Sequence, residues 1–320
     1  MRRTAAALSF PLLAIMLLAG CGSSSSSPPA ASNTNGSVAV SGTFGTVPAV
    51  KIPAANATSK LAIKTVIKGT GPVLGQTDSF VGNYAVYIWR GTTNKLALST
   101  FKNGSPQVLA ANVGLSGLKQ ALTGQRMGSR VLAVLPPKDA YGSAGNSQIG
   151  VKPTDTIVFV VDLIKAFSST ASASGKHVSN GGGALPTVTA IPGSGPTVKI
   201  PAKKRAPAKL IVKTLIKGSG PPTVKGQTVV TQYVGVNWRT GKAFDSSWSR
   251  KAPFGFTLDA SPAQIIPAWD KGLVGVPVGS RVMLIVPPAD GYGKTGNSQA
   301  GIKPTDTLVF VVDIIGAVGK

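Results

Sequence analysis

The stretch Lys60-Leu-Ala-Ile-Lys-Thr-Val-Ile-Lys-Gly69 returns further along the chain as Lys209-Leu-Ile-Val-Lys-Thr-Leu-Ile-Lys-Gly218. The match tightens downstream, where residues 141–164 and 292–315 differ at six of twenty-four positions. Each copy is long enough to hold a core of its own. The repeat therefore predicts two like-folded domains in tandem rather than a solenoid.

The composition favours strands and turns over long helices. The chain has 320 residues, 42% of them hydrophobic, with 39 Gly, 24 Pro and 10 acidic residues, all of which are Asp. Short runs of Val, Ile, Leu and Thr, punctuated by Gly and Pro, are typical of strands. In the second copy the pattern predicts strands over 208–217, 228–238, 254–258, 280–287 and 306–316. Pro267 predicts the first turn of one short helix, because a missing N–H costs nothing there, and Trp269 should face inward.

The N-terminus has the features of a processing segment. Arg2 and Arg3 precede an apolar run too short to span a bilayer comfortably, and the run ends in Leu18-Ala19-Gly20-Cys21. This resembles a bacterial lipobox, in which the cysteine is acylated and becomes the mature N-terminus. An ordinary secretory peptide or a signal anchor are the alternatives. We expect residues 1–20 to be a lipoprotein signal peptide and Cys21 to hold the chain on the outer face of the bacterial membrane.

The charge is strongly basic, with 33 Lys and Arg against 10 Asp. For a chain outside the bacterial membrane, such a charge favours anionic lipids or anionic cell-wall polymers as partners rather than nucleic acid. A solvated face that only aids solubility is the alternative. Cys21 and His177 are the only cysteine and histidine. Disulfides, thiolate zinc sites and histidine chemistry are therefore not expected, and we expect no metal or cofactor.

Ser, Gly and Pro content sets the expected domain boundaries. We predict a flexible stalk over 21–47, a first domain over 48–167, a linker over 168–197 and a second domain over 198–320. The sequence Gly291-Tyr-Gly-Lys-Thr-Gly296 fits the dinucleotide pattern G-x-G-x-x-G. No helix signal follows it and the expected βαβ context is missing, so it does not indicate a nucleotide site.

Five elements of the second copy occur in one order. They are Gln232-Tyr233, Gly241-Lys-Ala-Phe244-Asp245-Ser-Ser, Pro253-Phe-Gly-Phe256, Gln264-Ile-Ile-Pro-Ala-Trp269 and Pro288-Ala-Asp-Gly-Tyr292-Gly293. From about Lys209 to Val318 the sequence thereby resembles an FKBP-type peptidyl-prolyl cis-trans isomerase. The resemblance implies an α+β fold, in which each of two tandem domains wraps a twisted antiparallel sheet around one short helix.

The resemblance also implies a role for each matching residue. Trp269 would form the floor of a pocket for a proline ring, and Phe244 and Asp245 would lie at its rim. The Ile266 N–H and the Tyr292 hydroxyl would each bind a substrate carbonyl. The walls and the overhanging loop would be supplied by Tyr233, Phe254, Ile265, Phe310 and Ile302. The loop carries Asn297-Ser-Gln-Ala, where the family often has a histidine, which puts sequence preference in doubt more than activity.

The first copy lacks much of this set. It keeps Tyr84, Tyr141 and Phe159, but Leu118 stands at the floor and Gln107 at the place of Phe254. The Ile-Ile pair becomes Gly114-Leu115, and the Phe-Asp element falls within Leu96-Ala97-Leu98, where a length difference blurs the alignment. Weak or absent isomerase activity is expected here, with a smaller working pocket as the alternative.

Two functions of different classes follow from the sequence. The first is an extracytoplasmic prolyl isomerase, or rotamase, that acts on proline-containing polypeptide clients and assists the folding of exported proteins. The second is a non-catalytic lipoprotein that binds a peptide, a wall polymer or a partner protein. Rotation about an Xaa-Pro bond requires no proton transfer, so an isomerase can work without a catalytic His, Cys or metal, and the complete pocket of the second copy favours the enzyme.

Overall fold

The computed structural model describes residues 37–110, 114–178, 184–191 and 193–319. The chain divides into two compact units, Met1–Ala166 and Phe167–Lys320, and each is considered by itself. The expected signal peptide and Cys21 lie outside the described residues. Of the helices in the described ranges, none is both long and apolar enough to cross a membrane.

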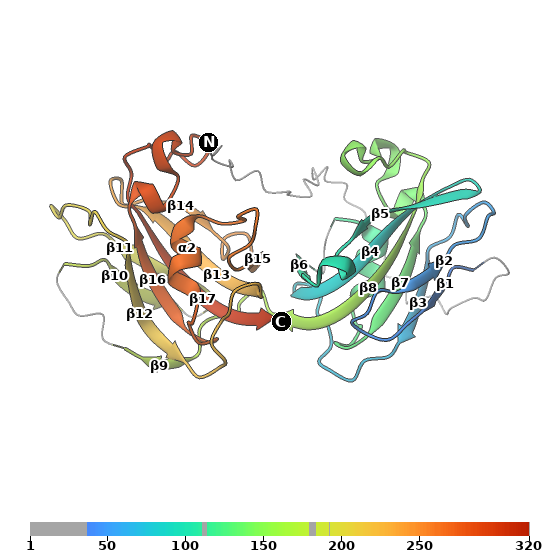
Figure 1. The fold of residues 1–320 in the computed structure, drawn as a ribbon, viewed down its shortest axis with the longest axis horizontal. Helices are drawn as coiled ribbons and strands as arrows, with labels where there is room; N and C mark the ends of the chain where they lie inside the picture. Colours follow the sequence, from blue (N-terminus) through green and yellow to red (C-terminus); the bar gives the residue numbers. More distant parts are fainter. Residues whose placement is uncertain (1–36, 111–113, 179–183, 192, 320) are drawn as a thin grey trace. The chain divides into compact units, whose positions relative to one another are not determined.

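The first unit is built on one six-stranded sheet (Figure 1). The strand order is β3-β7-β8-β4-β5, with β6 paired to β4. The strands are β3 (Ala62–Ile67), β4 (Ser79–Arg90), β5 (Thr93–Ser99), β6 (Gln107–Ala110), β7 (Arg130–Leu135) and β8 (Thr156–Phe167). A short helix, α1 (Ser116–Leu122), buries Leu118, Ala121 and Leu122. Short 3-10 turns η1 (Phe101–Asn103), η2 (Pro137–Asp139), η3 (Gly142–Ala144) and η4 (Ser147–Ile149) complete the unit.

The second unit repeats this plan. Its sheet has the order β14-β13-β17-β16-β12-β9, with β15 paired to β13. The strands are β9 (Gly175–His177), β12 (Ile211–Gly218), β13 (Thr228–Asn237), β14 (Ala243–Ser246), β15 (Phe254–Thr257), β16 (Arg281–Val286) and β17 (Leu308–Val318). The helix α2 (Pro267–Leu273) begins at Pro267 as predicted, and η5 (Pro288–Asp290) and η6 (Gly293–Thr295) precede β17. Five strands lie close to the predicted ranges, whereas β14 was not predicted.

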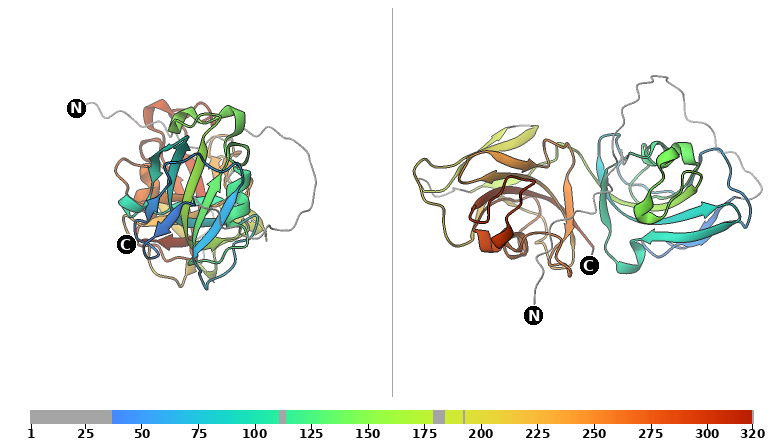
Figure 2. Two further views of the ribbon diagram at one scale, coloured as in Figure 1. Left: turned by 90° about the vertical axis from the view of Figure 1, so that its right-hand side faces the viewer. Right: turned by 90° about the horizontal axis from the view of Figure 1, so that it is seen from above.

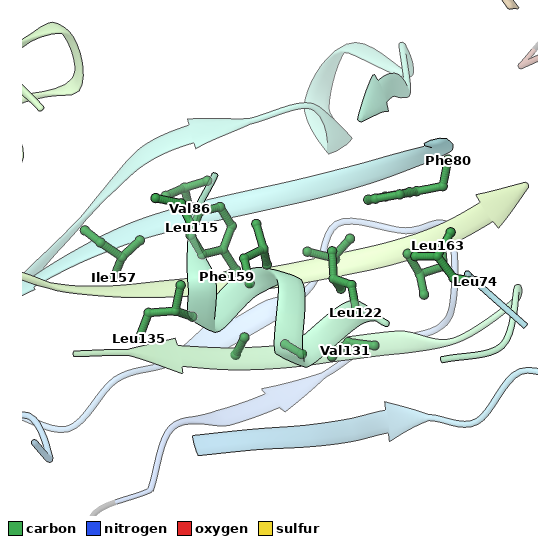
Figure 3. Packing of buried hydrophobic residues seen from close by; sticks show 14 of the residues in the cluster. Leu74, Phe80, Val86, Leu115, Leu122, Val131, Leu135, Ile157, Phe159 and Leu163 are labelled. Atoms are coloured by element: carbon green, nitrogen blue, oxygen red, sulfur yellow. The ribbon is translucent and has the colours of Figure 1, made fainter. Parts of the chain in front are cut away.

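Apolar side chains fill the space between each helix and its sheet. In the first unit, Figure 3 shows α1 lying across the strands, with Leu115 and Leu122 among the side chains between them. In the second unit, α2 packs so closely that a Cβ on Gly272 would lie 2.6 Å from Leu284 Cδ2. A side chain at that position would force either Leu284 or the helix to shift, so glycine allows this close approach.

The opposite face of each sheet is covered by a β-hairpin. In the first unit, β1 (Ala39–Ser41) pairs with β2 (Ala49–Lys51), and Val40 and Val50 pack on a buried cluster around Trp89. In the second unit, β10 (Thr187–Ile191) pairs with β11 (Ser194–Lys199) over a cluster that includes Trp238. Figure 2 shows this second hairpin, in yellow, on one side of its sheet.

These hairpins differ from the predicted boundaries. Residues 37–47 were assigned to the stalk and residues 168–197 to the linker, yet the described parts of both carry strands. A backbone N–H in each of these two segments also donates to the carboxylate of a buried ion pair. Gly45 N–H donates to Asp162 Oδ2 at 2.7 Å, and Ala173 N–H donates to Asp313 Oδ2 at 2.8 Å. Each domain therefore includes the chain that precedes the family-like region.

Candidate functional site

The site forms on the face of β13 that looks toward α2. Successive side chains of a strand point to opposite faces, and Val234 and Val236 belong to the cluster under the hairpin. Tyr233 therefore faces the helix, where its ring lies 5.2 Å from that of Trp269 at an interplanar angle of 85°. Both side chains are almost fully buried.

Trp269 is the centre of the aromatic cluster. Its ring lies 6.1 Å from Phe254, 5.4 Å from Phe256 and 5.5 Å from Phe310, in each case edge to face. Such contacts between aromatic rings are the preferred geometry at 4.5–7 Å and fix the orientation of each ring. The structure thus brings together the predicted floor and three predicted walls, Tyr233, Phe254 and Phe310.

Gly235 makes room for the predicted rim residue Phe244. The Phe244 ring packs edge-on against Phe310 at 5.6 Å. A Cβ on Gly235 would lie 2.6 Å from Phe244 Cζ and 3.0 Å from Phe310 Cε1. Because real Cβ contacts are longer, any side chain at position 235 would have to displace one of these rings.

A polar network lies at the edge of the aromatic cluster. The Tyr233 hydroxyl donates to Asp245 Oδ2, and Arg250 forms an ion pair with Asp245 Oδ1. Arg250 Nη2 also donates to the Tyr233 hydroxyl at 2.9 Å, and its guanidinium carbon lies 5.6 Å from the centre of that ring. Burial raises the pKa of Tyr233 well above its usual range, although Arg250 opposes the rise. Tyr233 therefore stays neutral and can donate its proton to the carboxylate.

Strand β14 and the turn after it hold Asp245 and Arg250 in place. Ser247 accepts a hydrogen bond from Tyr233 N–H at 2.7 Å and donates one to Gln232 Oε1 at 2.5 Å. Lys251 N–H then donates to the Trp248 carbonyl at 3.0 Å, which closes the turn. Both charged side chains are thereby attached to β13, the strand that carries Tyr233.

The start of α2 presents the predicted hydrogen-bond donor. Ile265 and Ile266 are each 8% exposed, and Ile266 is extended at φ −66° and ψ 150° just before the helix. Its N–H has no acceptor among the residues that the structure describes. The indole N–H of Trp269 is likewise buried without an acceptor in the described part of the chain.

Tyr292 and Ile302 lie on the loop between β16 and β17. Asn297 and Ile302 exchange two backbone hydrogen bonds of 2.8 Å, which pinch the loop and leave Ile302 buried. Tyr292 is half-buried, and burial raises the pKa of its hydroxyl, partly offset by a hydrogen bond with Asn297. The phenol is therefore a neutral donor at physiological pH.

Strand register shows what replaces these residues in the first domain. Val86 pairs with Leu98 where Gly235 pairs with Asp245, and Gly82 pairs with Gln107 where Thr231 pairs with Phe254. Tyr84 N–H bonds the Thr100 hydroxyl as Tyr233 N–H bonds Ser247. The register resolves the blurred alignment: Leu98 occupies the place of Asp245, and Gln107 that of Phe254, as predicted.

The first domain has a filled apolar site. Val86 and Leu118 are 3% and 4% exposed, and Ala97 and Leu98 pack against the same cluster. Figure 3 shows Val86 beside Leu115 and Phe159, between the helix and the sheet. By the same register, Val86 and Ala97 stand where the second domain has Gly235 and Phe244. In the first domain, Val86 on β4 therefore fills the volume that the Phe244 ring fills in the second domain.

Sequence reasoning did not identify Arg250 or Gly235. Arg250 follows Asp245 by five residues through a turn, and no periodicity connects the two. The contrast between Gly235 and Val86 in the repeat was a usable signal for the glycine. Among the described residues no group of three or more His, Cys, Asp or Glu could hold a metal ion.

Comparisons with known proteins agree with this geometry. The family model described as FKBP-type peptidyl-prolyl cis-trans isomerase matches residues 78–164 and 220–315. An FK506-binding protein of Streptomyces anulatus is 44% identical over 109 residues, covering 34% of this chain and 86% of the relative. A probable FK506-binding protein of Corynebacterium glutamicum is 36% identical over 122 residues, covering 38% of this chain and 98% of the relative.

Among solved structures, that of FkpA from Escherichia coli is 34% identical, with a TM-score of 0.32, and the match covers 36% of this chain and 51% of that one. The family model matches twice and spans more than half of the chain, including both helices and most strands of each sheet. The chain therefore belongs to the FKBP-type peptidyl-prolyl cis-trans isomerase family, with two FKBP domains, and is a peptidyl-prolyl cis-trans isomerase.

Proposed function

We propose that the second domain carries the isomerase activity of this chain. The observation that supports this most directly is the difference between the two copies. The second has the aromatic floor, the Phe244 rim and the network of Tyr233, Asp245 and Arg250. The first has apolar side chains at the floor and at the place of the acid.

The aromatic site suits the chemistry of the reaction. Rotation about an Xaa-Pro bond breaks amide resonance against a barrier of about 18–20 kcal/mol. The planar amide has a large dipole that water stabilises, whereas the twisted transition state has lost part of it. A dry site lined by Trp269, Tyr233, Phe254 and Phe310 therefore favours the transition state over the ground state.

Two donors are proposed to orient the substrate. The Ile266 N–H lacks an acceptor among the described residues and lies one turn of chain before Trp269, so it can bind a substrate carbonyl beside the proline ring. The neutral Tyr292 hydroxyl is proposed to bind a second carbonyl. Ile265 and Ile302 would close the apolar walls around the ring.

We further propose that the clients are exported proteins at the outer face of the bacterial membrane. The apolar N-terminal run ending in Cys21 is the basis for this location. Uncatalysed prolyl isomerisation takes tens to hundreds of seconds, which is slow enough to limit the folding of exported chains. An isomerase tethered by a lipidated Cys21 would meet such chains as they emerge.

For the first domain we propose a non-catalytic role, as a spacer or a binding module. It keeps the fold and the family's tyrosine, Tyr84, but Val86 fills the space that a Phe244-like ring would need. Binding of anionic cell-wall polymers by the basic chain remains a second proposal for partners, supported by the formal charge of +23.

A protease-coupled assay on Xaa-Pro peptides tests the assignment in the full mature chain. Trp269→Ala and Asp245→Leu should each lower kcat/KM by tenfold or more, about 1.4 kcal/mol of transition-state stabilisation per factor of ten. Leu118→Ala is the matched control, because Leu118 has the same place in α1 as Trp269 in α2, and it should leave the rate unchanged. Substantial activity remaining in a Trp269→Ala and Asp245→Leu double variant would assign catalysis to the first domain instead.

A further inference from the structure

One end of the second domain carries six exposed basic side chains on three neighbouring loops. We call this set the basic end patch: Lys203, Lys204, Arg205, Arg239, Lys242 and Lys303. Backbone and side-chain bonds join the loops. The Trp238 indole N–H donates to the Lys204 carbonyl at 3.2 Å, and Asn237 N–H donates to the Lys242 carbonyl at 3.0 Å. Trp238 N–H donates to the Thr307 carbonyl at 3.0 Å, which brings in the loop that carries Lys303.

Two acids lie in these loops, Asp290 and Asp306, and each already has a basic partner, since Asp290 pairs with Lys271 and Asp306 with Arg239. Asp306 is 4% exposed and accepts two hydrogen bonds from Arg239, at 2.7 and 2.8 Å. It also accepts bonds from Asn237 Nδ2 at 2.7 Å and from Lys303 N–H at 2.9 Å. The remaining five basic side chains of the patch have no recorded carboxylate partner within the described ranges.

The first domain shows that the fold does not need the charges of Lys203, Lys204 and Arg205, although it keeps Arg90 and Lys152 where the second domain has Arg239 and Lys303. Its corresponding loop is fixed in the same way, by a bond of 2.9 Å from the Trp89 indole N–H to the Ala55 carbonyl. Around Ala55 the sequence is Ala54-Ala-Asn56, where the second domain has Lys203-Lys-Arg205. An uncharged loop therefore forms the same anchor on the same fold.

The basic residues also carry a structural cost. Neighbouring like charges repel one another, and Lys203 has a positive φ of 59°, which L-residues adopt rarely. In the second domain the loop runs from Ile200 to the bonded carbonyl of Lys204. This is one residue longer than in the first domain, where it runs from Ile52 to the bonded carbonyl of Ala55. Charges that the fold does not require, held by a fixed loop, indicate a partner of opposite charge.

We propose that the basic end patch binds an anionic phospholipid surface. The proposal rests on the membrane location given under the proposed function, since a tethered chain meets lipid headgroups at high effective concentration. Its shape supports a surface over a linear polyanion. The charges are gathered on three loops that hydrogen bonds join, whereas an extended polymer would be matched by a basic stripe along a strand.

Vesicle co-sedimentation tests the proposal with the mature chain carrying Cys21→Ser, so that no acyl chain contributes. The vesicles contain phosphatidylcholine alone or with 30% phosphatidylglycerol. The patch variant is Lys203→Asn, Lys204→Gln and Arg205→Gln, with Asn chosen because it tolerates positive φ. The matched control removes the same charge from the first domain by Lys60→Gln, Lys64→Gln and Lys68→Gln.

The unmodified chain should bind the anionic vesicles and not the neutral ones. Each basic residue near an anionic surface contributes about fivefold, so the patch variant should bind about 100-fold more weakly. The control should lose less than about threefold, because its charges are not part of the patch. Isomerase activity on soluble peptides should be unchanged in both variants.

Several outcomes would overturn the proposal. Equal losses in the patch and control variants would mean that net charge alone drives binding. Binding to soluble poly(glycerol phosphate) but not to anionic vesicles would replace the lipid surface by a wall polymer. A chain that binds vesicles through the patch yet lacks isomerase activity would contradict the catalytic proposal alone, so the two failures are distinguishable.

Discussion

The substitution Gly235→Val should lower both the stability and the isomerase activity of the second domain. The new Cβ would lie 2.6 Å from Phe244 Cζ, 2.9 Å from Phe244 Cε2 and 3.0 Å from Phe310 Cε1, all inside the ordinary contact range of 3.4–4 Å. Phe310 is 4% exposed, whereas Phe244 is only half-buried on the edge strand β14. We therefore expect the Phe244 ring to move outward and leave the rim.

Overpacking of this kind costs about 1–3 kcal/mol. For a domain of this size, a loss of 2 kcal/mol lowers Tm by roughly 6 °C. Tryptophan fluorescence can follow the transition, because Trp238, Trp248 and Trp269 all lie in the second domain and only Trp89 lies in the first. In the protease-coupled assay, loss of the Phe244 contact should lower kcat/KM by about tenfold, equivalent to about 1.4 kcal/mol.

The double variant Gly235→Val with Phe244→Ala reproduces the pair found in the first domain, Val86 and Ala97. Its loss in the free energy of unfolding should be at least about 1 kcal/mol smaller than the sum of the losses in the two single variants, since the valine then fills the space left by the ring. Activity should stay low. If the two changes were additive in stability, or if Gly235→Val alone kept full activity, the steric argument would be wrong.

Three further predictions concern the rim, an acid-sensitive pair and the hairpin. Arg250→Leu should lower kcat/KM by no more than about fivefold, because its ion pair with Asp245 is half-exposed and worth at most about 1 kcal/mol; a 50-fold loss in the same assay would show a direct catalytic role. Hydrogen bonding from Arg239 lowers the pKa of Asp306 below its ordinary value of 3.8, so this stabilisation is present above about pH 3.8 and is lost as the pH falls further. Chemical denaturation from pH 6 to 2 should show this loss. The variant Asp306→Asn should be less stable at pH 6, but its stability should fall less as the pH is lowered. Parallel curves of stability against pH for the two proteins would contradict the assignment. A second domain begun at residue 200 lacks β9, β10 and β11 and should bind the dye ANS and melt lower than one begun at residue 167, because Val236 and Trp238 lose their cover.

Much of the second-domain site could be predicted from sequence because its residues are chemically distinctive. Trp269 at the start of a short helix, together with the spaced aromatics, identified the family, and the structure places Tyr233, Phe254 and Phe310 around that tryptophan. Their individual roles in binding substrate remain predictions. The strand pattern also located β13 and β17 because long runs of Val and Ile are hard to mistake.

The features that were missed depend on contacts rather than on composition. The hairpins have strands as short as three residues within Ser-, Gly- and Thr-rich sequence, and they are stabilised by tertiary packing of isolated valines such as Val40 and Val188. The link between Arg250 and Asp245 depends on a turn whose closure is not encoded by any period. Local propensity says little about either, because the hairpins depend on packing against clusters that include Trp89 and Trp238, and the ion pair depends on the conformation of one turn.

The covering hairpin bears on how this chain arose. Val47-Pro-Ala-Val-Lys-Ile-Pro-Ala54 at the first hairpin matches Gly195-Pro-Thr-Val-Lys-Ile-Pro-Ala202 at the second, upstream of both regions matched by the family model. The segment that was duplicated thus already included the hairpin. The ancestral gene encoded a domain closed on both faces, and the two descendants diverged in their pockets and surface charge while inheriting the same cover.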